Sequence, residues 1–259
     1  MALSDIKWPE LESDASAAEW AQRTDLAAAC RLVALHGWDD LVFTRLSARV
    51  PGPENHFLVN PGELMLEEVT ASSLVKVDAE GIAVTATPYR TDTVGFALHS
   101  AIHTFRASAG SVMVLYTPDC QAVSAMTEGL LPLTRTAMVV TSDLAYHDYK
   151  GTPTDLYGQA SLVAELGARN TMILRNHGAL AVGETVGECF VRLYFLERAC
   201  QAQVRAMAAG RAALSDPPAG VADKVARQSS GKSMQTIARD LAWPALLRKL
   251  DRIDPGFRR

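Results

Sequence analysis

The stretch TMILRNHGALAVGETVGE, residues 171–188, contains the pattern that decides the fold. Two short apolar runs at 171–174 and 179–182 have the composition of buried strands, and the Arg-Asn-His-Gly sequence between them is typical of a tight turn. A long helix is predicted to begin at Thr185, because Thr185 and Glu188 have the spacing of a capping box. This segment therefore predicts two neighbouring strands followed by a helix.

The rest of the chain alternates between short β-type runs and helical patterns. Strands are predicted at residues 41–43, 57–59, 74–77, 111–116 and 137–140. Helices are predicted at residues 25–36, 96–105, 154–166 and 245–250, with a further one after Pro118, and the run 145–149 is interpreted as a turn. Because strands alternate with helices, we expect an α/β domain whose helices pack on a central sheet.

Composition limits the classes of protein to consider. A chain of 259 residues, 48% of them hydrophobic, fits one large core, and we predict an N-terminal extension (1–20), one domain (21–210) and a C-terminal tail (211–259). The net charge is −4 without a basic stripe, so we expect no nucleic-acid partner. The acidic N-terminus is interrupted by Pro9, and no apolar run approaches the ~20 residues that span a bilayer. We expect a cytoplasmic protein without a membrane partner.

Several stretches carry a resemblance to a known family. They are GFALHSAIH (95–103), AYHDY (145–149) and MILRNHG (172–178), the last followed by VGETV (182–186). Together they resemble the class II aldolase/adducin family, most closely its adducin-like branch, and TASSLVKVD (70–78) and WPALLRKLDRIDP (243–255) are similar to bacterial members of that branch. The resemblance implies a three-layer α/β/α fold and usually a homotetramer with active sites at subunit interfaces. We expect the tail to pack on its own domain or on a neighbouring subunit, since its apolar face lacks an obvious partner within the chain.

The resemblance also implies a divalent metal, usually zinc, that stabilises the negative charge formed when a C–C bond breaks. Family members supply two ligands as His-x-His on a strand, and the third comes from the Asn-His-Gly turn. Here the two strand positions are Val114 and Tyr116, so only His177 remains. Valine cannot coordinate, and a neutral phenol with a pKa of about 10 is a poor zinc ligand. We expect no metal or other cofactor, and we assign a packing or hydrogen-bonding role to His99 and His103.

Two further positions differ from the family aldolases. Many of them carry a general acid/base glutamate where this chain has Gly95, although Asp92 and Thr93 leave a substitute open. Where they have Gly-Asn-x-Ser for phosphate, residues 44–47 are Thr-Arg-Leu-Ser, so only Ser47 is kept. A sugar phosphate is therefore not the expected ligand; Arg45 either binds another anion or is an exposed arginine at a strand edge.

The candidate site residues are His177 and Tyr116 as catalytic groups, and Asp119, Arg175 and Ser47 as substrate-binding groups. His177 and Tyr116 also have structural interpretations. His177 can be retained for a hydrogen bond in the turn, and Tyr116 can fill the space left by an imidazole and an ion.

The neighbouring residues are weaker candidates. Cys120 follows a proline near a predicted helix start, where the helix dipole can lower the pKa of a thiol, but we expect a buried, inert thiol. Tyr146 or His147 could reach the same pocket, and for His147 and Asp148 we expect structural hydrogen bonds.

Two functions follow as alternatives. The first is a metal-independent lyase that acts on a small carbonyl compound by aldol cleavage, decarboxylation or dehydration, with His177 or Tyr116 as acid/base. The second is a non-catalytic aldolase-fold protein that binds a small molecule or a partner. An iron-dependent oxygenase would need histidine and carboxylate ligands that the sequence does not assemble. The substrate and pathway stay open.

Overall fold

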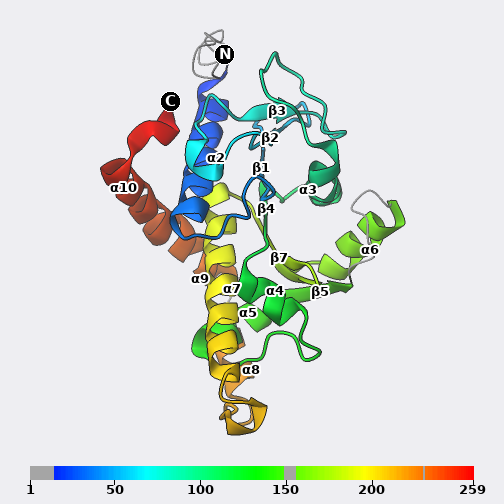
Figure 1. Ribbon diagram of the computed structural model, residues 1–259, viewed down its shortest axis with the longest axis vertical. Helices are drawn as coiled ribbons and strands as arrows, with labels where there is room; N and C mark the ends of the chain where they lie inside the picture. The colour runs from blue at the N-terminus through cyan, green and yellow to red at the C-terminus, as the bar shows by residue number, and fades with distance from the viewer. Residues whose placement is uncertain (1–14, 149–155, 230) are drawn as a thin grey trace.

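The protein is described by a computed structural model over residues 15–148, 156–229 and 231–259, and its centre is one seven-stranded sheet (Figure 1). The strand order is β3-β2-β1-β4-β7-β6-β5, and only β5 and β6 pair in parallel within it. The strands are β1 (Leu46–Arg49), β2 (Phe57–Val59), β3 (Val75–Val77), β4 (Ser111–Leu115), β5 (Leu144–Asp148), β6 (Thr171–Arg175) and β7 (Gly178–Gly183).

Helices cover both faces of the sheet. The α-helices are α2 (Ala17–Leu35), α3 (Thr93–Phe105), α4 (Pro118–Ser124), α5 (Arg135–Thr141), α6 (Leu156–Leu166), α7 (Val186–Met207), α8 (Val221–Gln228), α9 (Gly231–Thr236) and α10 (Trp243–Ile253). Shorter helical segments are η2 (Leu66–Glu68), η3 (Arg211–Ala213), η4 (Ile237–Ala242) and η5 (Pro255–Arg258). Helices α2 and α7 run side by side on one face, and α3 and α6 lie on the other, which confirms the predicted three-layer α/β/α architecture (Figure 1).

The alternation of side chains along β4 divides the core between these faces. Met113 and Leu115 pack into the apolar cluster beneath α2 and α7, whereas Val112 and Val114 pack into the cluster beneath α3 and α6. This is the period of two that a strand buried on both faces requires. It also fixes which way the residue after the strand, Tyr116, faces, because Tyr116 packs against the same cluster as Val114.

The predicted start of α7 is confirmed in detail. The backbone N–H of Glu188 donates to the Thr185 hydroxyl over 3.1 Å, so Thr185 caps the helix as the sequence indicates. The Glu188 carboxylate accepts from the N–H of Glu184 rather than from that of Thr185, over 3.0 Å. The reciprocal half of the capping box is therefore displaced by one residue.

The prediction of a strand at residues 137–140 is wrong, because these residues lie in helix α5. Thr134 caps that helix by accepting from the N–H of Ala137 over 3.1 Å, and Ala137 and Val140 bury one helical face against the sheet and α7. The β-branched pair Val139 and Val140 favours a strand locally, but tertiary packing outweighs that propensity.

Two other local predictions are also corrected. The run 145–149, interpreted as a turn, supplies β5 as far as Asp148, and the position of Tyr149 lies outside the described residues. Residues 41–43 form a loop instead of a strand, and Leu41 has a positive φ of 48°. The predicted helix start at 154 and the first 14 residues of the predicted extension also lie outside the described residues.

The C-terminal segment packs on its own chain. Trp243 donates from its indole N–H to Asp25 over 3.1 Å, and Phe257 is fully buried in the cluster beneath α2 and α7. A Cβ at Gly187 would lie 2.4 Å from the Trp243 ring. Only glycine at this position therefore lets α7 pack this closely against Trp243. Part of the tail's apolar surface therefore has its partner within the chain, whereas Leu241 and Ile253 remain exposed. The division at residues 20 and 210 stays a prediction, since α2 already begins at Ala17.

Within the described part of the chain, no helix has both the length and the apolar composition needed to cross a lipid bilayer.

Candidate functional site

The Asn-His-Gly turn joins β6 to β7 and lies against the end of β4. Asn176 adopts a positive φ of 57°, and its N–H donates to the carbonyl of Ser124 over 3.2 Å. A Cβ at Gly178 would lie 2.3 Å from the carbonyl oxygen of Leu115, so this position requires glycine. The tight turn predicted from residues 175–178 is thus present, and its close approach brings His177 beside the residue that follows β4.

Tyr116 and His177 meet at this point. Their ring centroids are 4.9 Å apart with an interplanar angle of 70°, an edge-to-face contact, and both side chains are half-buried. Burial disfavours the charged imidazolium and lowers the pKa of His177 below its ordinary value. His177 is therefore neutral at pH 7, and its imidazole ring contacts the aromatic ring of Tyr116.

The divalent metal that the resemblance implies does not fit these residues. Val114 has no donor atom, is 1% exposed and packs among apolar side chains, including Ile102 of α3. In residues 15–148, 156–229 and 231–259, no three histidine, cysteine or carboxylate side chains gather closely enough to hold an ion. The assignment of Val114 and Tyr116 to the family's ligand positions rests on the sequence resemblance and stays a prediction.

The Asp92 carboxylate fills the space where a side chain at residue 95 would lie. Asp92 caps α3 by accepting from the N–H of Gly95 over 2.9 Å, and a Cβ at Gly95 would lie 2.3 Å from the other carboxylate oxygen. That second oxygen pairs with the Arg45 guanidinium at 2.9 Å. Asp92, the substitute left open by the sequence, is thus already engaged as a helix cap and an ion-pair partner. Arg45 is 11% exposed, so it is not the exposed arginine that the sequence allowed.

Ser47 lies inside the domain rather than at a surface. Its hydroxyl is within 2.8 Å of His99 Nδ1 and 2.9 Å of His103 Nε2, and His103 Nδ1 lies 2.9 Å from the carbonyl of Ala109. Desolvation is the main cause that lowers the pKa of both imidazoles to about 3. The hydrogen-bonding role of His99 and His103 is confirmed. The enclosed hydroxyl of Ser47 does not support the predicted substrate contact.

Arg175 holds the loop that follows α4. Its guanidinium donates to the carbonyl of Met126 over 2.7 Å and lies over the Tyr146 ring, 4.5 Å from the centroid. The Tyr146 hydroxyl in turn accepts from the N–H of Leu130 over 3.0 Å. Both side chains, considered for the pocket, therefore fix residues 126–130 to the sheet. The expected structural role of His147 is also present, as its Nδ1 lies 2.6 Å from the Glu165 carboxylate.

A buried carboxylate beside Cys120 was not found from the sequence. Glu197 of α7 accepts from the Thr117 hydroxyl over 2.7 Å and from the Cys120 thiol over 2.6 Å. The neighbouring Cys200 thiol, burial and the Glu197 charge raise the pKa of Cys120 well above its ordinary value. The thiol thus stays protonated, as expected for an inert cysteine. Asp119 lies half-buried in the first turn of α4.

Comparisons with known proteins agree with this architecture. The chain is 51% identical over 257 residues to a Caulobacter vibrioides protein named with the class 2 aldolases, covering 99% of both chains. It is 42% identical over 189 residues to mouse alpha-adducin, which covers 72% of this chain and 26% of the adducin. The crystal structure of an aldolase II superfamily protein from Pseudomonas syringae has a TM-score of 0.91 and 40% identity, covering 97% of this chain and 100% of that one. The family model "Class II Aldolase and Adducin N-terminal domain" matches residues 24–204, and the chain therefore belongs to the class II aldolase/adducin family.

Proposed function

We propose that this protein keeps the class II aldolase/adducin fold but has given up metal-dependent lyase chemistry, and that it works as a non-catalytic binding protein. The observation that carries the proposal is the packing of Val114. A lyase of this family needs ligands where the chain has a buried valine and a half-buried tyrosine in contact with an apolar cluster. One imidazole, His177, cannot hold a catalytic ion alone, because affinity comes from several ligands together.

The charges near the turn support the same proposal. Carbon–carbon bond cleavage next to a carbonyl needs hydrogen-bond donors or a positive group aimed at the oxygen that becomes negative. Arg175 donates to the carbonyl of Met126, and Arg45 is paired with Asp92, so both guanidinium groups have structural partners. A carboxylate at residue 95 would in turn collide with Asp92. Arg175 and Arg45 thus stabilise the fold, whereas a lyase would need a group of this kind directed at its substrate.

A metal-independent lyase is the second candidate, and one observation favours it. Burial keeps His177 neutral at pH 7, and neutral imidazole is the form that a general base requires. Tyr116 lies beside it with a phenol that could donate a proton to a small carbonyl compound. If this candidate is correct, a panel of β-hydroxy ketones and β-keto acids will contain a substrate that wild-type protein cleaves in excess EDTA. His177→Gln will abolish that activity.

Zinc titration with a rebuilt site tests the non-catalytic proposal. The double variant Val114→His/Tyr116→His would place two imidazoles on the face of β4 next to His177. We expect zinc binding by calorimetry in the double variant and none of comparable strength in the wild type. The matched control is Met113→His/Leu115→His, which places the imidazoles on the opposite face. Stoichiometric zinc binding by the wild type, lost in His177→Gln, would defeat the proposal.

The assembly is part of the proposal, as family resemblance favours a homotetramer. Light scattering at micromolar concentration is expected to give the mass of four chains. The mass of a single chain would contradict it.

A further inference from the structure

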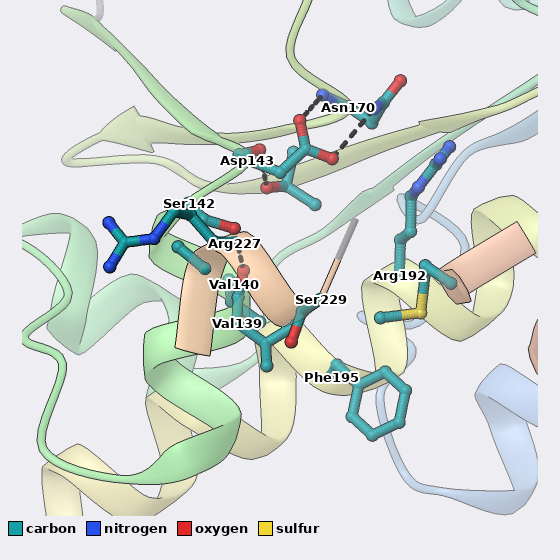
Figure 2. A pocket seen from close by; sticks show the side chains of 12 residues that line it. Val139, Val140, Ser142, Asp143, Asn170, Arg192, Phe195, Arg227 and Ser229 are labelled. Carbon is teal, nitrogen blue, oxygen red and sulfur yellow. Dashed lines mark hydrogen bonds between the residues drawn. The ribbon is translucent and has the colours of Figure 1, made fainter. Parts of the chain in front are cut away.

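A cavity lies at the opposite end of β6 from the Asn-His-Gly turn (Figure 2). Its volume is about 440 Å³, within the ~300–1,000 Å³ typical of small-molecule sites. It is bordered by the residues just before β5 and β6, by α5 and α7, and by α8 and α9. None of the residues predicted from the sequence to form a site lines it.

One part of the cavity wall is apolar. Val139 and Val140 of α5, Phe195 of α7 and Met234 of α9 line it together. Phe195 lies on the opposite side of the cavity from Asp143 and Asn170 (Figure 2). This wall favours a ligand with a branched aliphatic or similar apolar group.

Two opposite charges line the cavity without an ion-pair partner among the described residues. Asp143 accepts from the backbone N–H and the side-chain amide of Asn170, over 3.0 and 2.8 Å, and a carboxylate has about four acceptor positions. Its remaining positions are unused by the described residues. Arg227 of α8 is exposed and forms no hydrogen bond or ion pair with another described residue.

The third charge in the wall is already neutralised. Arg192 pairs with Glu188 at 2.5 Å and donates to the carbonyl of Val182 over 2.8 Å. Arg192 and Arg227 lie on opposite sides of the cavity, so the guanidinium left for a ligand is on the α8 side (Figure 2). Among the lining residues, Asp143 and Arg227 are therefore the charged groups without an ion-pair partner in the described residues, and Arg106, outside the wall, also acts on Asp143 through its charge.

We propose that this cavity binds an α-amino acid with an apolar side chain. The ligand ammonium would pair with Asp143, its carboxylate with Arg227, and its side chain would cover the wall formed by Val139, Val140 and Phe195. The Asp143 carboxylate would repel a purely anionic ligand, and a purely cationic ligand would leave Arg227 unpaired. A zwitterion satisfies both charges at once. The inference concerns a different end of the sheet from the proposed loss of the metal site and does not depend on it.

Calorimetry with L-leucine and its two truncated analogues is the first test. The analogues are 4-methylpentanoate, which lacks the ammonium, and 3-methylbutylamine, which lacks the carboxylate. We expect leucine to bind and each analogue to bind more weakly by up to about fivefold, the upper range for one partly exposed ion pair. Absence of leucine binding, or equal binding of either analogue, would overturn the proposal.

Variants of the protein give the second test. Arg227→Gln removes an exposed side chain without a described partner, so the fold should be unaffected, and leucine binding should weaken about fivefold. Arg248→Gln on α10 is the matched control, because Arg248 is also exposed but does not line the cavity, and it should leave binding unchanged. Val139→Phe should weaken leucine binding, because the larger ring takes up part of the space beside the apolar wall. Unchanged leucine binding in Arg227→Gln would refute the assigned contact. Val114→His/Tyr116→His should leave leucine binding unchanged, which separates this proposal from the first.

Discussion

The two ends of strand β6 differ in how their polar groups are used. At the Asn-His-Gly end, Arg175 holds a loop and Asp92 caps a helix near Gly95. At the other end, Asp143 and Arg227 line a cavity without an ion-pair partner among the described residues. Polar groups that already satisfy one another stabilise the fold, whereas those with spare capacity can bind a ligand. The difference supports the proposal that the polar groups at the Asn-His-Gly end serve the fold, whereas those at the other end can bind a ligand.

The largest expected effect is at the turn. Gly178→Ala would place a Cβ 2.3 Å from a backbone oxygen of Leu115, and the resulting overpacking should cost about 3 kcal/mol of unfolding free energy. Urea denaturation measures it. Gly220→Ala is the control, since no atom lies within 4 Å of its Cβ and only its positive φ of 79° opposes the change, at about 1 kcal/mol. Equal costs at the two positions would show that the turn is not tightly packed against β4.

Acid should destabilise the packed end through its buried histidines. The folded-state pKa values of His99 and His103 are about 3, below the unfolded value of about 6.5, so the unfolded chain binds more protons at intermediate pH. Their contribution is complete above pH 6.5 and is lost as the pH falls towards 3. Between pH 6 and 5 we expect the free energy of unfolding to decrease by roughly 1 kcal/mol for each histidine.

Urea denaturation at these two pH values measures the slope, and NMR titration of the imidazoles provides an independent check. Protonation of either imidazole near pH 6 in the folded protein would contradict the buried network around Ser47.

Removing Arg175 should have a moderate effect. Arg175→Gln loses a hydrogen bond from a charged donor and a cation–π contact with Tyr146, which together should cost about 2 kcal/mol. Arg227→Gln at the other end should change stability by less than about 0.5 kcal/mol, because it loses no described contact. Thermal melts of both variants compare the two ends directly. A larger loss in Arg227→Gln would reverse the comparison.

The smallest effect concerns Cys120. Its thiol donates to Glu197 and is buried, so we expect no measurable alkylation by iodoacetamide at pH 7 over the time in which a free thiol reacts fully. Mass spectrometry of peptides after labelling, with and without urea, gives the result. Rapid labelling of Cys120 in the folded protein would show that the buried surroundings of this thiol open to solvent.

Local patterns in the sequence predicted the parts of the fold that local interactions determine. The cap at Thr185 and the tight turn before Gly178 depend on neighbouring residues, so their sequence patterns were sufficient. Helix α5 was missed because Val139 and Val140 favour a strand and only packing against α7 decides otherwise.

Contacts between distant residues explain the remaining differences. Ser47 and His99 are 52 positions apart, and Cys120 and Glu197 are 77 apart, so no spacing in the sequence indicates either contact. The cavity beside Asp143 is built from several separate segments of the chain and has no sequence motif. The motifs that resemble the family point instead to the Asn-His-Gly turn at the other end of β6.

Metal analysis of wild-type protein tests the central claim most directly. The protein should be purified without a metal-affinity tag, and its content of zinc, manganese and iron should be measured by elemental mass spectrometry. Because Val114 offers no donor and Tyr116 only a phenol, a poor ligand for these metals, we expect less than about one tenth of an equivalent of any of them per chain. About one equivalent of metal per chain, lost in His177→Gln, would contradict the account and return the protein to the metal-dependent lyases.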